Sequence, residues 1–223
     1  MGRISKSFKK WKEYSKISDL GIIARRKFFN NCFDGALTCA GIVSGIFIIF
    51  LSKETSQFTP QTVTVTGLAT ALAIGISGLW GAFLSEEAER KKKVDDMKKE
   101  MAMIEEDEDE NNETSNLEII SNKKKKKQVK TLLEKAEDFA TLIASLVDGG
   151  APVLGSSLPL IPFFFGGDLR YLHFIFSYII LAALLVYLGN FLGKISGGGR
   201  VRYAIHLVTA GVVTLLVSIL LGI

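Results

Sequence analysis

The feature that most constrains this chain is a series of apolar stretches, each about long enough to cross a lipid bilayer. A helix of about 20 apolar residues spans the ~30 Å hydrocarbon core of a membrane. Five such stretches follow one another, at residues 35–51, 63–84, 139–167, 171–193 and 203–223. The stretches are continuous rather than alternating, so they predict helices and not strands. We therefore expect an all-α polytopic membrane protein with five transmembrane helices.

The second and third spans are separated by a strongly charged insert at residues 86–138, which holds 17 of the 23 acidic residues. Apolar residues recur at heptad spacing in its two arms, 86–104 and 128–138, and this pattern predicts a helical hairpin. The stretch between the arms is of low complexity, and we expect it to be disordered. The predicted organisation is an N-terminal segment (1–30), spans one and two (31–85), the insert (86–138) and spans three to five (139–223).

The distribution of basic residues predicts the orientation in the membrane. Of the 27 Lys and Arg residues, 25 lie before the first span, in the insert, or between spans four and five. Loops rich in Lys and Arg stay on the cytoplasmic side, so we expect a cytoplasmic N-terminus and insert and an outside C-terminus. Segment 3–17 then fits an amphipathic helix on the membrane surface, and the alternative is a flexible basic tail. A membrane surface accounts for the net charge of +4 without nucleic acid.

Two acidic residues fall within the predicted spans. Asp34 stands at the mouth of the first apolar stretch, where it could be a helix N-cap or a metal or proton site. Asp148 lies about 15 Å along a helix from Asp138, which predicts a position near the midplane. It could be a pathway group, or it could make a buried hydrogen bond to a neighbouring helix. Glycines and prolines, among them Pro152, predict that the third span is interrupted and that the carbonyl of Asp148 lacks its helical donor.

The insert offers further candidate ligands. Glu86 and Glu89 form an i, i+3 pair after the second span, and Glu100 is followed by Met101. Clustered carboxylates suit divalent cations, and methionine adds a softer ligand. The alternative is a solvated surface on which these acids pair with lysines. No Walker loop and no nucleophile–base motif occurs, so we predict a protein that is not an enzyme and has no cofactor.

Three motifs carry a resemblance to a known family. They are FDGALTCAGIVSG in the first span, LATALAIG in the second and GAPVLGSSLPLIPFF in the third. In this order, around a large insert, they resemble the vacuolar iron transporter family, and the chain is similar to its prokaryotic-type members. The resemblance implies a homodimer with an ion path between the subunits, which moves Fe²⁺ or Mn²⁺ out of the cytosol, with protons as the expected counter-ion.

The resemblance also assigns residues. The family's aspartate in the first span corresponds to Asp34, and the metal-collecting Glu and Met residues correspond by position to Glu86, Glu89, Glu100 and Met101. Leu72 and Ile76 stand where the family has a methionine and a glutamate, so the path lacks a thioether and favours the harder Mn²⁺. Asp148 would then replace the missing acid of the second span.

The expected location is the cell membrane in a prokaryote, or the vacuolar membrane in a eukaryote. The alternative function is a non-transporting membrane scaffold whose charged hairpin binds partners.

Overall fold

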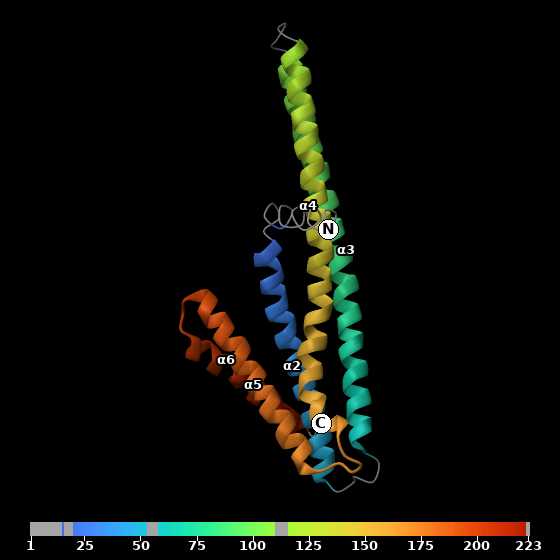
Figure 1. Ribbon diagram of the computed structural model, residues 1–223, viewed down its shortest axis with the longest axis vertical. Coiled ribbons are helices and arrows are strands. Elements are labelled where there is room, and N and C mark those ends of the chain that lie inside the picture. Colours follow the sequence, from blue (N-terminus) through green and yellow to red (C-terminus); the bar gives the residue numbers. More distant parts are fainter. Residues whose placement is uncertain (1–14, 16–19, 53–57, 110–115, 222–223) are drawn as a thin grey trace, which may run out of the picture. The chain divides into compact units, whose positions relative to one another are not determined.

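The computed structural model describes residues 15, 20–52, 58–109 and 116–221, and every regular element in these ranges is helical (Figure 1). No strand occurs among them. The elements are α2 (Leu20–Leu51), α3 (Pro60–Asp109), α4 (Asn116–Ser157), the 3₁₀ helix η2 (Leu158–Phe164), α5 (Tyr171–Ser196) and α6 (Arg200–Leu221).

Five segments of these helices are long and apolar enough to cross a membrane, as the sequence predicts. They are Leu20–Leu51, Pro60–Lys93, Lys135–Phe164, Tyr171–Ser196 and Arg200–Leu221. The all-α fold with five candidate spans is confirmed.

The described residues form two compact units, and α3 and α4 contribute to both. The first unit comprises the described residues of Met1–Ala24 and Trp80–Leu146, and the second those of Arg25–Leu79 and Val147–Ile223.

In the first unit, α3 and α4 run side by side in opposite directions, as the green and yellow helices of Figure 1. An ion pair of 2.8 Å between Arg90 Nη1 and Asp138 Oδ1 joins the two arms. Helix extends over 105–109 and 116–127, so the prediction of disorder there is wrong for these residues. Lys and Glu are good helix formers, and a high density of charge does not by itself prevent a helix.

Two predictions about this region fall outside what the structure describes. The side chains of 101–134, which include most of the heptad positions, are outside the described part, so the apolar seam of the hairpin stays a prediction. Nearly all of the predicted amphipathic segment 3–17 also lies outside the described residues.

The third span is not interrupted where the sequence suggested. Helix α4 passes through Pro152 to Ser157, and only then does the chain tighten into η2, which contains Pro159 and Pro162. The hydroxyl of Ser156 donates a 2.5 Å hydrogen bond to the carbonyl of Pro152, and Ser157 donates one of 2.6 Å to Val153. These two bonds satisfy carbonyls near the C-terminal end of α4, where the α-helix gives way to η2.

Small residues let the helices of the second unit approach closely. A Cβ on Gly35 of α2 would overlap the backbone of Pro152 in α4, and a Cβ on Gly155 would overlap the carbonyl of Cys32. Gly75 and Gly78 of α3 meet α4 around Gly149 in the same way. Such contacts are typical of helix packing in membranes. They set α2 parallel to α4, and α3 antiparallel to α4.

Two buried clusters hold these helices and α5 together. One is built around α2 and α5, with Ala36, Ala40, Leu181 and Leu185 among its members. The other joins α2 to η2 and α5 through residues such as Val43, Leu160 and Phe174. The cysteines, Cys32 and Cys39, are free and buried within these clusters, as expected of small packing residues.

Candidate functional site

Asp148 is the centre of a polar cluster in the second unit. Its Oδ2 lies 2.5 Å from Nζ of Lys27, and its Oδ1 accepts a 2.5 Å hydrogen bond from Nδ2 of Asn31. The side chains of Lys27 and Asp148 are only 20% and 12% exposed. Both carboxylate oxygens therefore have donors, one of them charged, and charge-assisted bonds of this kind are among the stronger hydrogen bonds in proteins.

The local structure explains why these groups meet. Lys27 and Asn31 are four residues apart on α2 and so share one face of the helix. The close packing of Gly35 on Pro152 holds that face against α4. On the other side of α4, a Cβ at Gly78 would lie 2.9 Å from the carbonyl oxygen of Asp148. This is the carbonyl that Pro152 leaves without a helical donor.

The register of α2 and α4 places Asp148 beside Asn31. Asp148 contacts Asn31, and four residues further along both helices Pro152 meets Gly35. The candidate spans that contain these residues run over Leu20–Leu51 and Lys135–Phe164. The depth of Asp148 in the membrane stays a prediction.

Asp34 has a different environment. It lies in the interior of α2, which excludes the N-cap alternative. Its side chain is exposed, whereas the adjacent Gly35 is buried against α4. The hydroxyl of Thr38 donates a 3.0 Å bond to the backbone carbonyl of Asp34 and leaves the carboxylate untouched. This carboxylate therefore faces away from the packed core of its own chain.

The acids of the insert lie in the first unit and are interleaved with basic residues. Glu86 and Glu89 contribute to a cavity of about 120 Å³. Its lining consists of Ile23, Glu86, Glu89, Arg90, Lys93, Glu137, Ala140, Thr141 and Ala144. Glu87 is paired with Lys91 at 2.8 Å. Glu100 and Met101 belong to α3, but their side chains are outside the described part.

The predicted metal ligands do not converge within the described part of one chain. No group of three or more His, Cys, Asp and Glu side chains there has an arrangement that could hold a metal ion. Asp34 and Asp148 belong to the second unit, and Glu86 and Glu89 to the first.

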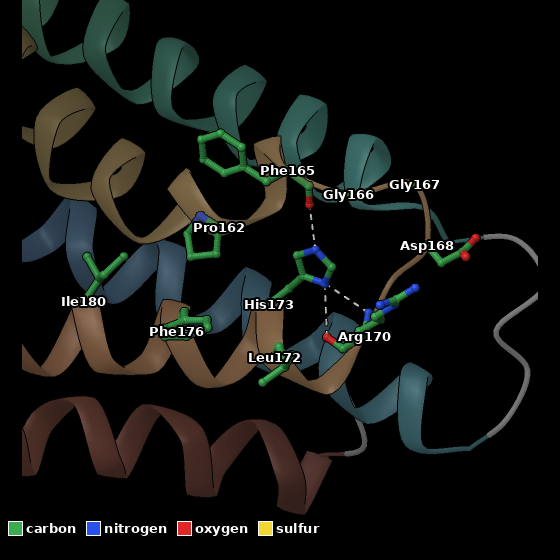
Figure 2. A pocket seen from close by; sticks show the side chains of 10 residues that line it. All are labelled: Pro162, Phe165, Gly166, Gly167, Asp168, Arg170, Leu172, His173, Phe176 and Ile180. Atoms are coloured by element: carbon green, nitrogen blue, oxygen red, sulfur yellow. Dashed lines mark hydrogen bonds between the residues drawn. The ribbon is translucent and has the colours of Figure 1, made fainter.

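A second cavity, of about 540 Å³, lies at the loop between η2 and α5 (Figure 2). Its polar side is organised by His173. Nε2 of this histidine bonds the carbonyl of Phe165 at 2.7 Å, and Nδ1 accepts a 3.0 Å bond from the backbone N–H of Arg170. The tautomer with its proton on Nε2 satisfies both contacts. The ring also stacks on Phe163. His173 therefore fixes the loop, whereas His206 is exposed on α6.

Five candidate membrane spans, with an acidic residue within the first of them, define a class: an integral α-helical membrane protein. The sequence profile of the VIT family matches residues 26–223, which is nearly the whole chain. The chain belongs to this family, and the predicted membership of the vacuolar iron transporter family is confirmed. The members of the family are transporters, and membership suggests metal ion transport.

A relative from Methanocaldococcus jannaschii, the uncharacterized protein MJ0645, is 25% identical to this chain over 171 residues. The match covers 77% of this chain and 74% of the relative. Its description assigns no substrate, so the ion remains to be inferred from the residues of the site.

Lys27 is the site residue that the sequence analysis missed. It was counted among the basic residues that precede the first span, and the predicted span began after it. Its spacing of four residues from Asn31 was a usable signal, because both side chains must then lie on one face of a helix. The sequence gives no indication that Asp148, 121 residues away along the chain, would be the partner.

Proposed function

We propose that this protein is a homodimeric transporter that moves a divalent transition metal, Mn²⁺ or Fe²⁺, out of the cytosol in exchange for protons. The observation that supports this proposal most directly is the exposed carboxylate of Asp34 within a membrane-spanning helix. Ionisable side chains within membrane-spanning helices are costly and usually face a cavity, a pathway or a partner. A second copy of the chain placed against this face of α2 would give Asp34 that environment.

The dimer would also account for the coupling between metal transport and proton transport. A twofold axis beside α2 would place two Asp34 carboxylates in one site. Two carboxylates close together do not ionise independently, so the pair retains a proton that a divalent cation can replace. Metal entering from one side would then release protons, and protons entering from the other side would release the metal.

The preferred metal follows from the ligands that the first two spans offer. Leu72 and Ile76 of α3 are both exposed, and neither offers a sulfur or oxygen ligand. The ion would therefore meet carboxylate and amide oxygens, which favour harder cations. Among the two expected substrates this favours Mn²⁺. In the insert, Glu86 and Glu89, with Glu100 and Met101 further along α3, remain the proposed collecting residues.

The test is metal uptake into proteoliposomes that contain the purified full-length protein, with Mn²⁺, Fe²⁺, Zn²⁺ and Ca²⁺ in competition and with an imposed pH gradient. We expect Mn²⁺ and Fe²⁺ flux that depends on the gradient. Asp34→Asn should abolish flux while leaving the protein dimeric, because an amide keeps the size of the side chain but cannot release a proton. Asp168→Asn, in the exposed loop before α5, is the matched control and should retain flux.

Normal flux in the Asp34→Asn protein would contradict the assignment of the pathway. A wild-type protein that inserts correctly but carries none of the four metals would instead favour the scaffold alternative.

A further inference from the structure

The carboxylate of Asp148, one of the proposed metal ligands, is already paired with the ammonium group of Lys27. The ammonium group of Lys27 lies 2.5 Å from Oδ2 of Asp148, and the amide of Asn31 donates to Oδ1 at the same distance. All three side chains belong to one compact unit, and the pair is largely shielded from solvent. The carboxylate thus already holds one positive charge when no metal is present.

We propose that Lys27 is a tethered counter-ion that fills the cation site of Asp148, and that a divalent metal binds there only by displacing the ammonium group. This inference rests on the proposed transport function and adds to it a residue that controls access and selectivity.

The chemistry of the three side chains suits such an exchange. Lysine carries a compact charge on a flexible four-carbon stem, so its ammonium group can move away without a change in the backbone. The amide of Asn31 has a donor and an acceptor end, and a half-turn about its last bond would replace Nδ2 with Oδ1. A metal would then meet the carboxylate of Asp148 and the carbonyl oxygen of Asn31. Both are hard oxygen ligands of the kind that Mn²⁺ accepts.

The tether also gives the site a basis for selection by charge. A covalently attached cation competes at a high effective concentration, which does not depend on the solution outside. A monovalent ion such as Na⁺ offers no more charge than the ammonium group and has no tether. A divalent ion binds the carboxylate more strongly and can displace the ammonium group.

The pair also explains how an empty site tolerates its charge. An unpaired carboxylate of this burial would be costly, and the usual remedies are a bound proton, a bound metal or a fixed counter-ion. Lys27 supplies the fixed counter-ion.

The test combines Mn²⁺ binding, followed by the electron paramagnetic resonance signal of free Mn²⁺, with the KM for Mn²⁺ flux of the full-length protein. Lys27→Gln should tighten Mn²⁺ binding and lower the KM by about tenfold, the equivalent of one charge-assisted hydrogen bond. Lys27→Arg should have the opposite effect, because a guanidinium group can bind a carboxylate with two parallel bonds. In an Asp148→Asn background, neither substitution should change Mn²⁺ binding.

A purely structural clamp between α2 and α4 predicts a different pattern. It would make Lys27→Gln less stable to heat and leave Mn²⁺ affinity unchanged or weakened, and that result would overturn the inference. If Lys27→Gln does not fold, the Lys27→Arg protein distinguishes the two explanations. The tethered counter-ion predicts weaker Mn²⁺ binding in this variant, and a clamp predicts no change.

The outcome also separates this inference from the proposed function. Flux that does not depend on residue 27 would refute the tethered counter-ion alone. An Asp148-dependent shift in Mn²⁺ binding in a protein without flux would refute transport alone.

Discussion

Gly35 of α2 packs directly on the backbone of Pro152 in α4, so closely that a single added Cβ would overlap it. The neighbouring Asp34 is exposed on another face of α2. The Asp–Gly pair in the first-span motif therefore serves two purposes. The glycine fixes the register of two parallel helices, and this register brings Asp148 to Lys27 and Asn31. The aspartate is left on the surface, available to a pathway or a partner.

Replacing Gly35 with alanine tests this contact. The new methyl group would push α2 away from α4, and overpacking of this kind typically costs about 1–3 kcal/mol. We expect Gly35→Ala to lower the thermal unfolding temperature of the detergent-solubilised protein.

The control for this prediction is on α4. Gly150 is exposed and has no atom of another segment within 4 Å of the position where a Cβ would be. Gly150→Ala should be neutral or stabilising, because alanine is the better helix former by up to about 1 kcal/mol. Equal losses of stability in the two variants would show that the close approach at Gly35 is not the cause.

A hydrogen bond between Ser44 Oγ of α2 and Tyr178 Oη of α5, 3.1 Å long, gives a second prediction. Ser44 is fully buried, so its hydroxyl would lose its partner in Tyr178→Phe. Polar contacts between membrane helices average about 0.6 kcal/mol in coupling energy. A double-mutant cycle with Ser44→Ala and Tyr178→Phe should give a coupling of this order in unfolding experiments. Strictly additive effects would mean that the two hydroxyls do not interact.

The loop that His173 holds gives a third prediction (Figure 2). His173→Ala removes the bonds to Phe165 and Arg170, each worth about 0.5–1.5 kcal/mol. We expect faster amide hydrogen exchange at Arg170 and a lower unfolding temperature. His206→Ala, at an exposed position on α6, is the control and should leave both quantities unchanged. Unaltered exchange at Arg170 in the His173→Ala protein would contradict a role in fixing the loop.

The orientation in the membrane gives a fourth prediction, which rests on the placement of the basic residues. Ala88 and Gly167 are both exposed, the first in the insert and the second in the loop before α5. In a background without Cys32 and Cys39, an impermeant thiol reagent added to intact cells should label Gly167→Cys and not Ala88→Cys. Ala88→Cys should become reactive once the cells are opened. The reverse pattern would invert the predicted topology.

The sequence by itself determined the class of fold and the family. Within a bilayer a helix satisfies its own backbone hydrogen bonds. Each span can therefore be recognised from a local run of apolar residues. The motif around Asp34 could be read in the same local way, because its residues are neighbours in the chain. The cost of burying a carboxylate was also enough to single out Asp148 before any partner was known.

Only the tertiary structure decided what surrounds these groups. The partner of Asp148 depends on the register between α2 and α4. That register is set by glycine contacts between segments more than 100 residues apart. Helix α4 also continues through Pro152, where it packs on Gly35 of α2. Local patterns specify which segments become helices, but the pairing of side chains between helices follows from packing, which no single segment contains.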